Sequence, residues 1–238
     1  MKPRVLVTRP EPGAARTAAR LAAAGFEPVV LPLTRIAPED FTLPEGPFDA
    51  VLATSAQALK VALPKRLLKR PVFAVGETTA LSARSAGFDA VIIAGGSAGS
   101  IAALVKKSAK PAARLLYLCG KVRRPELEAA LADAGFQVAA VETYDAAPVA
   151  YLDQEAAERL GGAPIDAVAL MSAQTANLFA ALAAKPGFAP LFRSSEIICL
   201  SPRISGALEK AAGWSVSVTP EASEDALMKL LSKRFAHE

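Results

Sequence analysis

The sequence has a single histidine, His237, and only two cysteines, Cys119 and Cys199, among its 238 residues. One histidine in the C-terminal tail excludes Ser-His-Asp and Cys-His nucleophilic schemes, which need an imidazole base beside the nucleophile. Two cysteines are too few for a disulfide framework, and with that histidine they cannot assemble a usual zinc site. No G-x-G-x-x-G follows the first apolar run, and no Walker A sequence occurs. We therefore expect neither a metal nor an organic cofactor.

Long apolar runs, aromatic residues and a strong charge imbalance are missing as well. No run reaches the roughly 18 apolar residues that span a bilayer, and the opening MKPRVLVTRP has no apolar core or cleavage site of a signal peptide. Aromatic residues make up 6% and the net charge is +4, so nucleic-acid binding is not indicated. We expect a cytoplasmic protein without membrane or nucleic-acid partners. The small positive excess fits an anionic small molecule, or a solvated surface without further meaning.

The chain does contain a repeated pattern of an apolar strand, a loop with Ser, Thr or Gly, an Ala-rich helix and a Gly-aromatic step. Three units occur twice in the same order, so that the units from Arg4, Asp49 and Val72 recur from Arg114, Asp166 and Ile197. Short apolar strands that alternate with helices predict βαβ units and parallel sheets. The glycines of the Gly-aromatic steps are interpreted as helix C-terminal residues in the left-handed conformation: Gly25, Gly87, Gly135 and Gly213.

Two stretches of similar shape, LPLTRIAP at 31–38 and VETYDAAP at 141–148, each follow such a unit and end in Ala-Pro. Proline has a fixed φ and no backbone N–H, so a strand that reaches Ala-Pro leaves its sheet there. Two exits at equivalent points predict a chain that crosses twice between two bodies, with a cleft between them that Tyr144 faces. Tyr144 either seals this junction or donates a hydrogen bond to a substrate leaving group.

Six strand ends carry a small hydroxyl residue or a glycine at the turn into a helix. Ligands of open parallel sheets bind at these carboxyl ends, where helix N-termini present free N–H groups. Each Ser or Thr taken singly is explained by helix N-capping. Taken together, and with the basic residues, the six ends predict a site for several carboxylates. Its predicted substrate-binding residues are Arg9, Ser55, Ala56, Gln57, Gly76, Thr78, Thr79, Gly120, Arg123, Ser172, Ala173, Ser201 and Arg203.

The motifs VLVTRP, DAVLATSAQA, VFAVGETTA, LLYLCGKVRRPELEAALADAGFQV with VETY, DAVALMSAQT and IICLSP resemble, in this order and spacing, the uroporphyrinogen-III synthase family. The resemblance covers nearly the whole chain. It implies an α/β protein of two parallel-sheet, three-layer, flavodoxin-like domains. They would be a discontinuous domain of residues 1–32 plus 150–238 and a second domain of residues 39–142. Residues 33–38 and 143–149 would form a two-stranded antiparallel β linker.

The resemblance also implies a lyase that closes hydroxymethylbilane to uroporphyrinogen III, with inversion of the D ring and loss of water, in tetrapyrrole biosynthesis. Tyr144 matches the linker tyrosine and becomes the catalytic residue; Thr79, Ser55 and Ser172 match hydroxyl residues of the family, and Arg9 and Arg123 match basic ones. A monomer is expected. The alternative hypothesis is a non-enzymatic two-domain binding or sensor protein for a polyanionic small molecule.

Overall fold

The computed structural model describes residues 2–123, 125–208 and 213–235. The chain forms two compact units: unit 1 comprises residues 1–35 and 147–238, and unit 2 runs from Ile36 to Ala146. Each unit is built on one sheet of mainly parallel strands covered by helices. The predicted α/β class with parallel sheets is therefore confirmed. No helix in the described part of the chain is long and apolar enough to cross a membrane.

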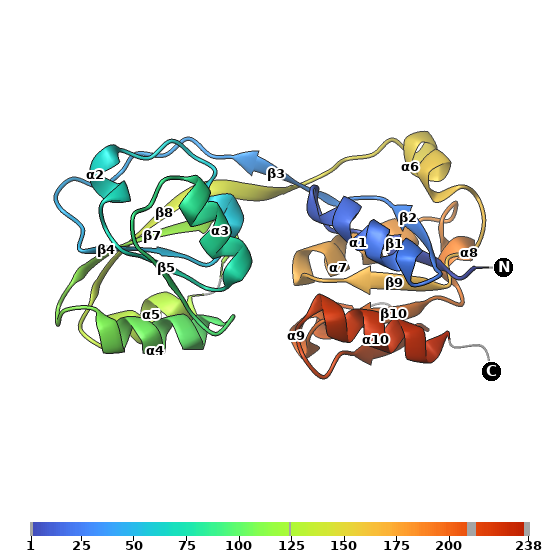
Figure 1. Cartoon of the computed structure of the whole chain (residues 1–238). Helices are drawn as coiled ribbons and strands as arrows, with labels where there is room; N and C mark the ends of the chain where they lie inside the picture. Colours follow the sequence, from blue (N-terminus) through green and yellow to red (C-terminus); the bar gives the residue numbers. More distant parts are fainter. Residues whose placement is uncertain (1, 124, 209–212, 236–238) are drawn as a thin grey trace. The chain divides into compact units, whose positions relative to one another are not determined.

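The first sheet lies in unit 1 and has the strand order β11-β10-β9-β1-β2 (Figure 1). All its neighbouring pairs are parallel. Its strands are β1 (Arg4–Val7), β2 (Glu27–Val30), β9 (Ala167–Leu170), β10 (Glu196–Cys199) and β11 (Ser215–Val218). Its helices are α1 (Gly13–Ala23), α6 (Asp153–Leu160), α7 (Ala173–Ala183), α8 (Ala189–Phe192), α9 (Pro202–Gly206) and α10 (Glu224–Arg234).

The second sheet has the order β3-β8-β7-β4-β5-β6, and the pairs from β8 to β6 are parallel. Its strands are β3 (Thr34–Pro38), β4 (Ala50–Ala53), β5 (Val72–Ala74), β6 (Val91–Ile93), β7 (Arg114–Gly120) and β8 (Gln137–Pro148). The helices of unit 2 are η1 (Ala56–Leu59), α2 (Lys65–Leu68), α3 (Glu77–Ser85), α4 (Ala98–Ser108) and α5 (Glu126–Ala132).

Strand β3 runs antiparallel to β8 at the edge of this sheet. The Glu39 N–H donates to the Thr143 carbonyl at 3.1 Å, and the Val149 N–H donates to the Leu33 carbonyl at 3.0 Å. Residue numbers therefore rise along one strand as they fall along the other. Both Ala-Pro stretches named in the sequence lie in these two strands, which end at Pro38 and Pro148.

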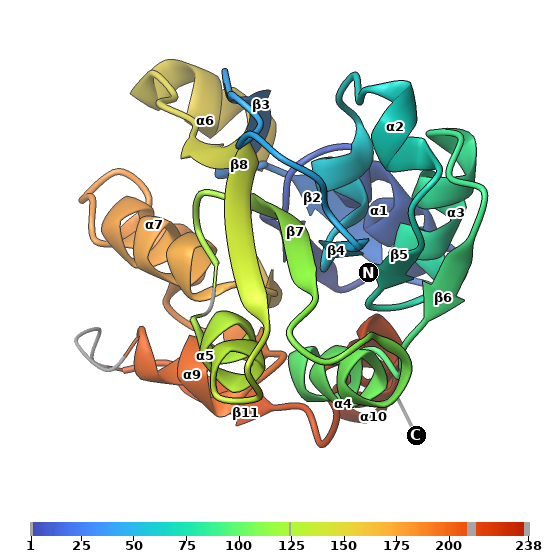
Figure 2. The same ribbon diagram turned by 90° about the vertical axis from the view of Figure 1, so that its left-hand side faces the viewer.

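Both faces of each sheet are buried, which explains the continuous apolar character of the strands. In unit 2, Leu52, Phe73 and Leu115 pack against α4 and α5, whereas Val51 and Leu116 face η1, α2 and α3. Figure 2 shows α4 and α5 next to each other beneath the sheet. In unit 1, α6 to α9 cover one face, and α1 and α10 cover the other. Each unit thus has three layers.

The two sheets share one spatial order, because β9, β10, β11, β1 and β2 occupy the places that β4, β5, β6, β7 and β8 take in unit 2. This agreement bears out the internal duplication. Counted along the chain, the order is 2-1-3-4-5 in unit 1, as in flavodoxin, but 3-2-1-4-5 in unit 2. The difference arises because the chain enters the duplicated arrangement at different strands. The flavodoxin-like label therefore describes the strand order of unit 1 and not that of unit 2.

The glycines of the four Gly-aromatic steps take positive φ angles: 91° at Gly25, 93° at Gly87, 82° at Gly135 and 110° at Gly213. Such angles suit glycine at the end of a helix and strain other residues. Phe26, Phe88 and Phe136, which follow three of these glycines, are buried in the cores. The interpretation as helix C-terminal glycines is confirmed for Gly25, Gly87 and Gly135, which follow α1, α3 and α5. For Gly213 it stays a prediction, because residues 209–212 before it lie outside the described residues.

Candidate functional site

The carboxyl ends of the strands of unit 2 bring together residues that are far apart in the sequence. Strands β4, β5, β7 and β8 are parallel, so the residues that follow or end them lie at one edge of the sheet. Of the predicted site, this edge carries Ser55 after β4, Gly76 after β5, Gly120 at the end of β7 and Tyr144 in β8.

Tyr144 lies across Gly120, and a β-bulge puts it there. Cys119 pairs with Glu142, but Gly120 pairs with Tyr144, so β8 contains one residue more than β7 between these two pairs. The extra residue, Thr143, is buried and donates to the Ala58 carbonyl at 3.2 Å. A Cβ on Gly120 would come within 2.7 Å of Tyr144 Cζ and 2.9 Å of its Oη. Only glycine leaves room for the phenol at this place.

The side chain of Ser55, just beyond the end of β4, lies near the hydroxyl of Tyr144. Burial raises the pKa of Tyr144 above its ordinary value of 10.0, and the neighbouring Ser55 side chain lowers it only in part. The phenol is therefore protonated at neutral pH and acts as a donor. Ser55 accepts a bond from the Gln57 N–H at 3.2 Å, which orients its side chain at the start of η1. The structure thus joins two predicted site residues.

A second phenol–hydroxyl pair lies beside the first. Tyr117 of β7 and Thr54 are 2.7 Å apart, oxygen to oxygen. Burial raises the pKa of Tyr117, and the bond with Thr54 opposes this shift. Tyr117 is buried in the core of unit 2. Leu52 pairs with Tyr117 in the parallel register of β4 and β7, which places the end of β4 beside that phenol and became visible only in the fold.

Arg123 lies in the turn after β7 and is held by two carboxylates. Its Nε donates to Glu128 at 2.8 Å and its Nη1 to Glu142 at 2.6 Å. These bonds, first that with Glu128 and then that with Glu142, raise the pKa of the Arg123 guanidinium. Because both neighbours already compensate its charge, Arg123 fixes the turn in this structure. Its predicted contact with substrate stays a prediction.

Lys121 was missed by sequence reasoning. It lines a cavity of about 430 Å³ together with Arg123, Pro125, Glu128 and Ala129. Its N–H donates to the Tyr144 carbonyl at 2.9 Å, so the backbone of this turn is tied to β8. The Lys121 side chain is exposed and has no ion pair within the described part of the chain. The sequence did contain a signal for Lys121, because this basic residue directly follows Gly120, a predicted site residue.

The other predicted residues of unit 2 lie at the same edge with different exposure. Thr79 in α3 is only 4% exposed, whereas Thr78 beside it is exposed. Gly76 precedes α3 in extended backbone, and its added Cβ would meet no atom closer than 3.9 Å. Ala56 and Gln57 open η1 and are partly buried. Lack of space for a Cβ atom therefore explains why residue 120 is glycine, but it does not explain why residue 76 is.

In unit 1 the predicted residues are occupied by structural contacts. Arg9 donates to Glu224 of α10 at 3.1 Å and to Thr17 at 3.2 Å, so its charge is compensated. Ser172 caps α7 by accepting from the Thr175 N–H at 3.1 Å. The interpretation of Ser172 as a helix N-cap is confirmed. The contact of Ser172 with substrate stays a prediction.

The remaining predicted residues of unit 1 are less constrained. Ala173 is the first residue of α7 and is partly buried. Ser201 precedes α9, and its buried Oγ has no hydrogen-bond partner in the described chain. Arg203 is exposed. These three residues lie at the carboxyl ends of β9 and β10, as the sequence predicted.

The sequence profile of the family described as uroporphyrinogen-III synthase HemD matches residues 15–229. The chain belongs to the uroporphyrinogen-III synthase family. It shares its fold with the uroporphyrinogen-III synthetase of Helicobacter pylori 26695, with a TM-score of 0.67 at 18% identity over 98% of this chain and 100% of that one. A mutant uroporphyrinogen III synthase from the extremely thermophilic bacterium Thermus thermophilus gives a TM-score of 0.53 at 19% identity over 98% of each chain. No curated protein matches the sequence.

Membership of the uroporphyrinogen-III synthase family confirms the predicted function and makes the chain an enzyme of porphyrin and tetrapyrrole biosynthesis. It supports this function over a non-enzymatic binding or sensor protein.

The two buried thiols play no visible part at this edge. Burial raises the pKa of Cys119 to about 11 and that of Cys199 to about 12, so both thiols are protonated and poor nucleophiles at neutral pH. Within residues 2–123, 125–208 and 213–235, no three His, Cys, Asp or Glu side chains are grouped to hold a metal. His237 lies outside the described residues.

Proposed function

We propose that this member of the uroporphyrinogen-III synthase family acts as a lyase. It converts hydroxymethylbilane into uroporphyrinogen III and water, with inversion of the D ring, and Tyr144 assists the departure of the hydroxyl group. The observation that carries this assignment is the buried Tyr144 phenol, which lies across Gly120 at the carboxyl edge of the sheet with Ser55 beside it.

In the first step the bond between the hydroxymethyl carbon and its oxygen breaks. Tyr144 donates a hydrogen bond, and then its proton, to the departing oxygen, which leaves as water. The positive charge that remains is shared with the pyrrole nitrogen as an azafulvene cation. Because burial raises the pKa of Tyr144, the phenol is a weak acid and suits a leaving group that needs little help. Ser55 orients its hydroxyl toward this task.

In the second step the D-ring carbon that already bears the bridge attacks the cation, and a spirocyclic pyrrolenine forms. Rearrangement and loss of one proton restore the aromatic pyrrole, and this proton returns to Tyr144. Atoms therefore balance as substrate to product plus one water. The protein contributes chiefly by holding a flexible chain so that the hindered carbon, not the free one, meets the cation. Exclusion of water protects the cation during this step.

The eight carboxylates of the substrate need cations and N–H donors. Lys121 supplies an uncompensated ammonium group next to the Tyr144 backbone. Gly76, Thr78 and Thr79 start α3, whose first N–H groups have no partner within the helix. We include the strand ends of unit 1 in the same role, with Ser172, Ala173, Ser201 and Arg203 as carboxylate contacts. For Arg9 and Arg123, binding of substrate requires exchange of their present carboxylate partners.

The same proposal assigns residues 33–38 and 143–149 as linker strands between the discontinuous domain 1–32 plus 150–238 and the domain 39–142. The antiparallel bonds between β3 and β8 support it. We propose a cytoplasmic monomer that works without cofactor, nucleic acid or membrane.

The test is an isomer assay. Freshly prepared hydroxymethylbilane is incubated with the protein, and the uroporphyrinogens are oxidised and separated by chromatography. We expect the III isomer to predominate, whereas the protein-free control gives the uninverted I isomer. Formation of the I isomer alone at high protein concentration would refute the proposed activity.

A further inference from the structure

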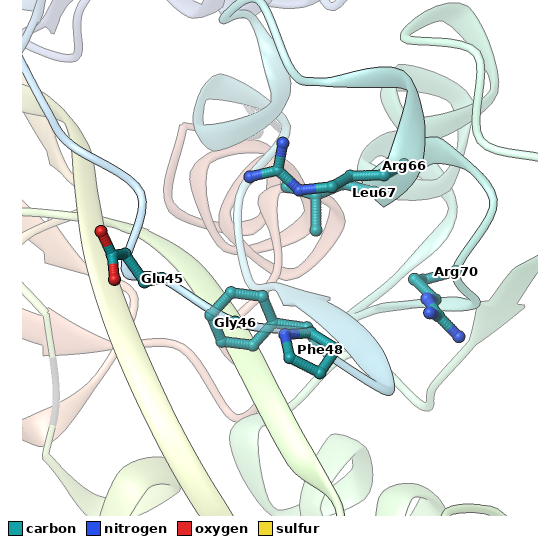
Figure 3. A pocket seen from close by; sticks show the side chains of 7 residues that line it. Glu45, Gly46, Phe48, Arg66, Leu67 and Arg70 are labelled. Atoms are coloured by element: carbon teal, nitrogen blue, oxygen red, sulfur yellow. The ribbon is translucent and has the colours of Figure 1, made fainter.

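A cavity of about 450 Å³ lies at the edge of the unit 2 sheet opposite to Tyr144. Its lining residues come from the loop before β4 and from α2 and the turn that follows it: Glu45, Gly46, Pro47, Phe48, Arg66, Leu67 and Arg70. Because β4 and β5 are parallel, residues that precede them lie at the amino edge of the sheet. Figure 3 shows the two arginines on the side of α2 and the Glu45–Phe48 loop across from them. The cavity is therefore separate from the proposed catalytic edge.

The cavity carries more positive charge than its own carboxylate compensates. Arg66 lies in α2, and Arg70 lies in the turn that joins α2 to β5, so two guanidinium groups line the cavity. Both side chains are exposed, and neither has an ion pair in the part of the chain that the structure describes. Glu45 is the only acidic residue that lines the cavity. An anion placed here would supply the two guanidinium groups with a counter-charge.

The wall and floor of the cavity are held in place without a ligand. Arg114 of β7 donates from Nη1 to the Glu45 carbonyl at 2.7 Å and to the Pro47 carbonyl at 3.4 Å. Its guanidinium also lies 4.6 Å from the centre of the Phe48 ring. Phe48 and Leu67 are 4% and 3% exposed, so they form a packed apolar floor. A preorganised site loses less entropy on binding than a mobile one.

In unit 1, the place equivalent to this cavity is filled by direct contacts between a loop and a helix. There Ile165 stands where unit 2 has Phe48, and Ser195 stands where it has Arg70. The Ser195 hydroxyl is buried and donates to the Ile165 carbonyl at 2.6 Å, and the Ile165 N–H donates to the Leu191 carbonyl of α8 at 2.8 Å. Unit 1 thus ties the helix directly to the loop. Unit 2 replaces this contact with a charged residue and an open cavity.

We propose that this cavity binds a small organic polyanion with a flat apolar body, of the aromatic polycarboxylate class. Arg66 and Arg70 pair with two acidic groups, and the body of the ligand rests against Phe48, Leu67 and Pro47. A volume of about 450 Å³ suits a ligand of one or two rings. Two separate guanidinium groups select an extended polyanion over a single monovalent ion. The proposal is independent of the catalytic function.

The probe is benzene-1,3,5-tricarboxylate, titrated calorimetrically into the full chain at low ionic strength. Citrate, which has as many carboxylates but no ring, is the matched probe. We expect the aromatic probe to bind at least about threefold more tightly, because the apolar floor contributes only to it. Equal affinity for the two probes would overturn the assignment of an apolar body, and no binding of either would overturn the site.

Substitutions of single residues test where the aromatic probe binds. Arg66→Gln and Arg70→Gln should each weaken the aromatic probe about tenfold, as expected for a lost charge-assisted bond. The matched control is Lys65→Gln, which removes the same charge from the same helix at a residue that does not line the cavity. Glu45→Gln should tighten binding. A smaller cavity of about 220 Å³ shares Arg70 but not Arg66, so an effect of Arg70→Gln without one of Arg66→Gln would move the ligand there and overturn the proposal.

Turnover of hydroxymethylbilane should be unchanged in Arg66→Gln and Arg70→Gln, since both residues lie at the amino edge. Equal weakening in the Lys65 control would show general attraction to a basic helix and would likewise refute a built site.

Discussion

The carboxyl edges of the two units share one spatial arrangement of equivalent strands but differ in their chemistry. In unit 1, Ser172 exchanges hydrogen bonds with Thr175 and caps the 11-residue helix α7. In unit 2, the equivalent Ser55 caps the four-residue turn η1 and lies near the hydroxyl of Tyr144. The duplication therefore preserved the scaffold and its serine, whereas the reactive pair exists in one copy only.

The cause of this difference lies in the strand that follows each unit. Strand β2 ends at Val30, but its counterpart β8 continues to Pro148 and contains the bulge beside Gly120. In the aligned stretches 31–38 and 141–148, Thr34 stands where unit 2 has Tyr144. Thr34 is buried and too short to reach a neighbouring strand end. A longer side chain, a bulge and a glycine were all needed to make the site.

The strongest test of this comparison is Gly120→Ala. The added Cβ would displace the Tyr144 ring, and displacement of a catalytic group by about 1 Å costs on the order of a hundredfold in kcat. Steady-state kinetics of the isomer assay measure the loss, and circular dichroism checks the fold. Gly187→Ala is the control, since its Cβ would meet no atom within 4 Å. Full activity of Gly120→Ala would mean that the position of Tyr144 is unimportant.

Tyr144→Phe should lower kcat by about 10- to 100-fold, because it removes the proton donor and keeps the ring. The raised pKa of Tyr144 keeps the phenol protonated to a higher pH than an ordinary tyrosine. The alkaline fall of kcat/KM should therefore lie above pH 10.0 in the wild type and vanish in the variant. A variant with the wild-type rate and pH profile would return Tyr144 to a packing role.

The two serines allow a direct comparison. Ser55→Ala should lower kcat by a few-fold, about fivefold, because Tyr144 loses its orienting partner. Ser172→Ala should affect turnover less and stability more, since loss of a helix cap costs about 1 kcal/mol. That cost corresponds to roughly 2–4 °C in thermal midpoint for a protein of this size. The thermal midpoint and kcat of both variants test this comparison. Equal changes in the two variants would refute the proposed difference between the units.

We expect Lys121 to contribute to substrate binding and Arg123 to contribute to the stability of the fold. Lys121→Gln should raise KM about threefold with little change in kcat, as expected when uniform substrate binding is lost. Arg123→Gln leaves Glu128 and Glu142 without their partner, so the thermal midpoint should fall in that variant and not in Lys121→Gln. Kinetics and thermal unfolding of the two variants side by side decide between these roles.

The smallest effect concerns the cysteines. Their pKa values of about 11 and about 12 and their burial predict that neither Cys119 nor Cys199 reacts with iodoacetamide at pH 8 until the protein is unfolded. Mass spectrometry after brief exposure measures the modification. Alkylation of the folded protein with loss of activity would place a thiol at the site.

Much of the fold could be predicted because it follows from local periodicity. Apolar runs such as Val5–Val7 and Ile197–Cys199, separated by helical patterns, require parallel strands buried on both faces. The Gly-aromatic steps required left-handed helix ends. The strand ends that carry Ser55, Gly120 and Ser172 could be named because parallel sheets gather them at one edge.

Other features depend on contacts between distant residues and could not be predicted. Arg9 is compensated by the distant Glu224, and Arg123 by Glu142 as well as by the nearby Glu128; only the folded chain shows these pairs. The hydroxyl pairing of Tyr117 with Thr54 depends on the register of β4 against β7. The cavity beside Arg66 and Arg70 depends on a helix and a loop that meet only in the folded chain.

The amino-acid sequence by itself determined the α/β class, the duplication and the family, because these rest on residue types and spacings that survive without coordinates. Tertiary structure decided which serine meets a phenol, which arginines are already paired, and why residue 120 is a glycine. The physical reason is the distance along the chain over which each feature is determined. Strand and helix periodicity is recognisable within about a dozen neighbouring residues. The role of a hydroxyl, a bulge or a counter-charge depends instead on an atom that the fold brings to within about 3 Å.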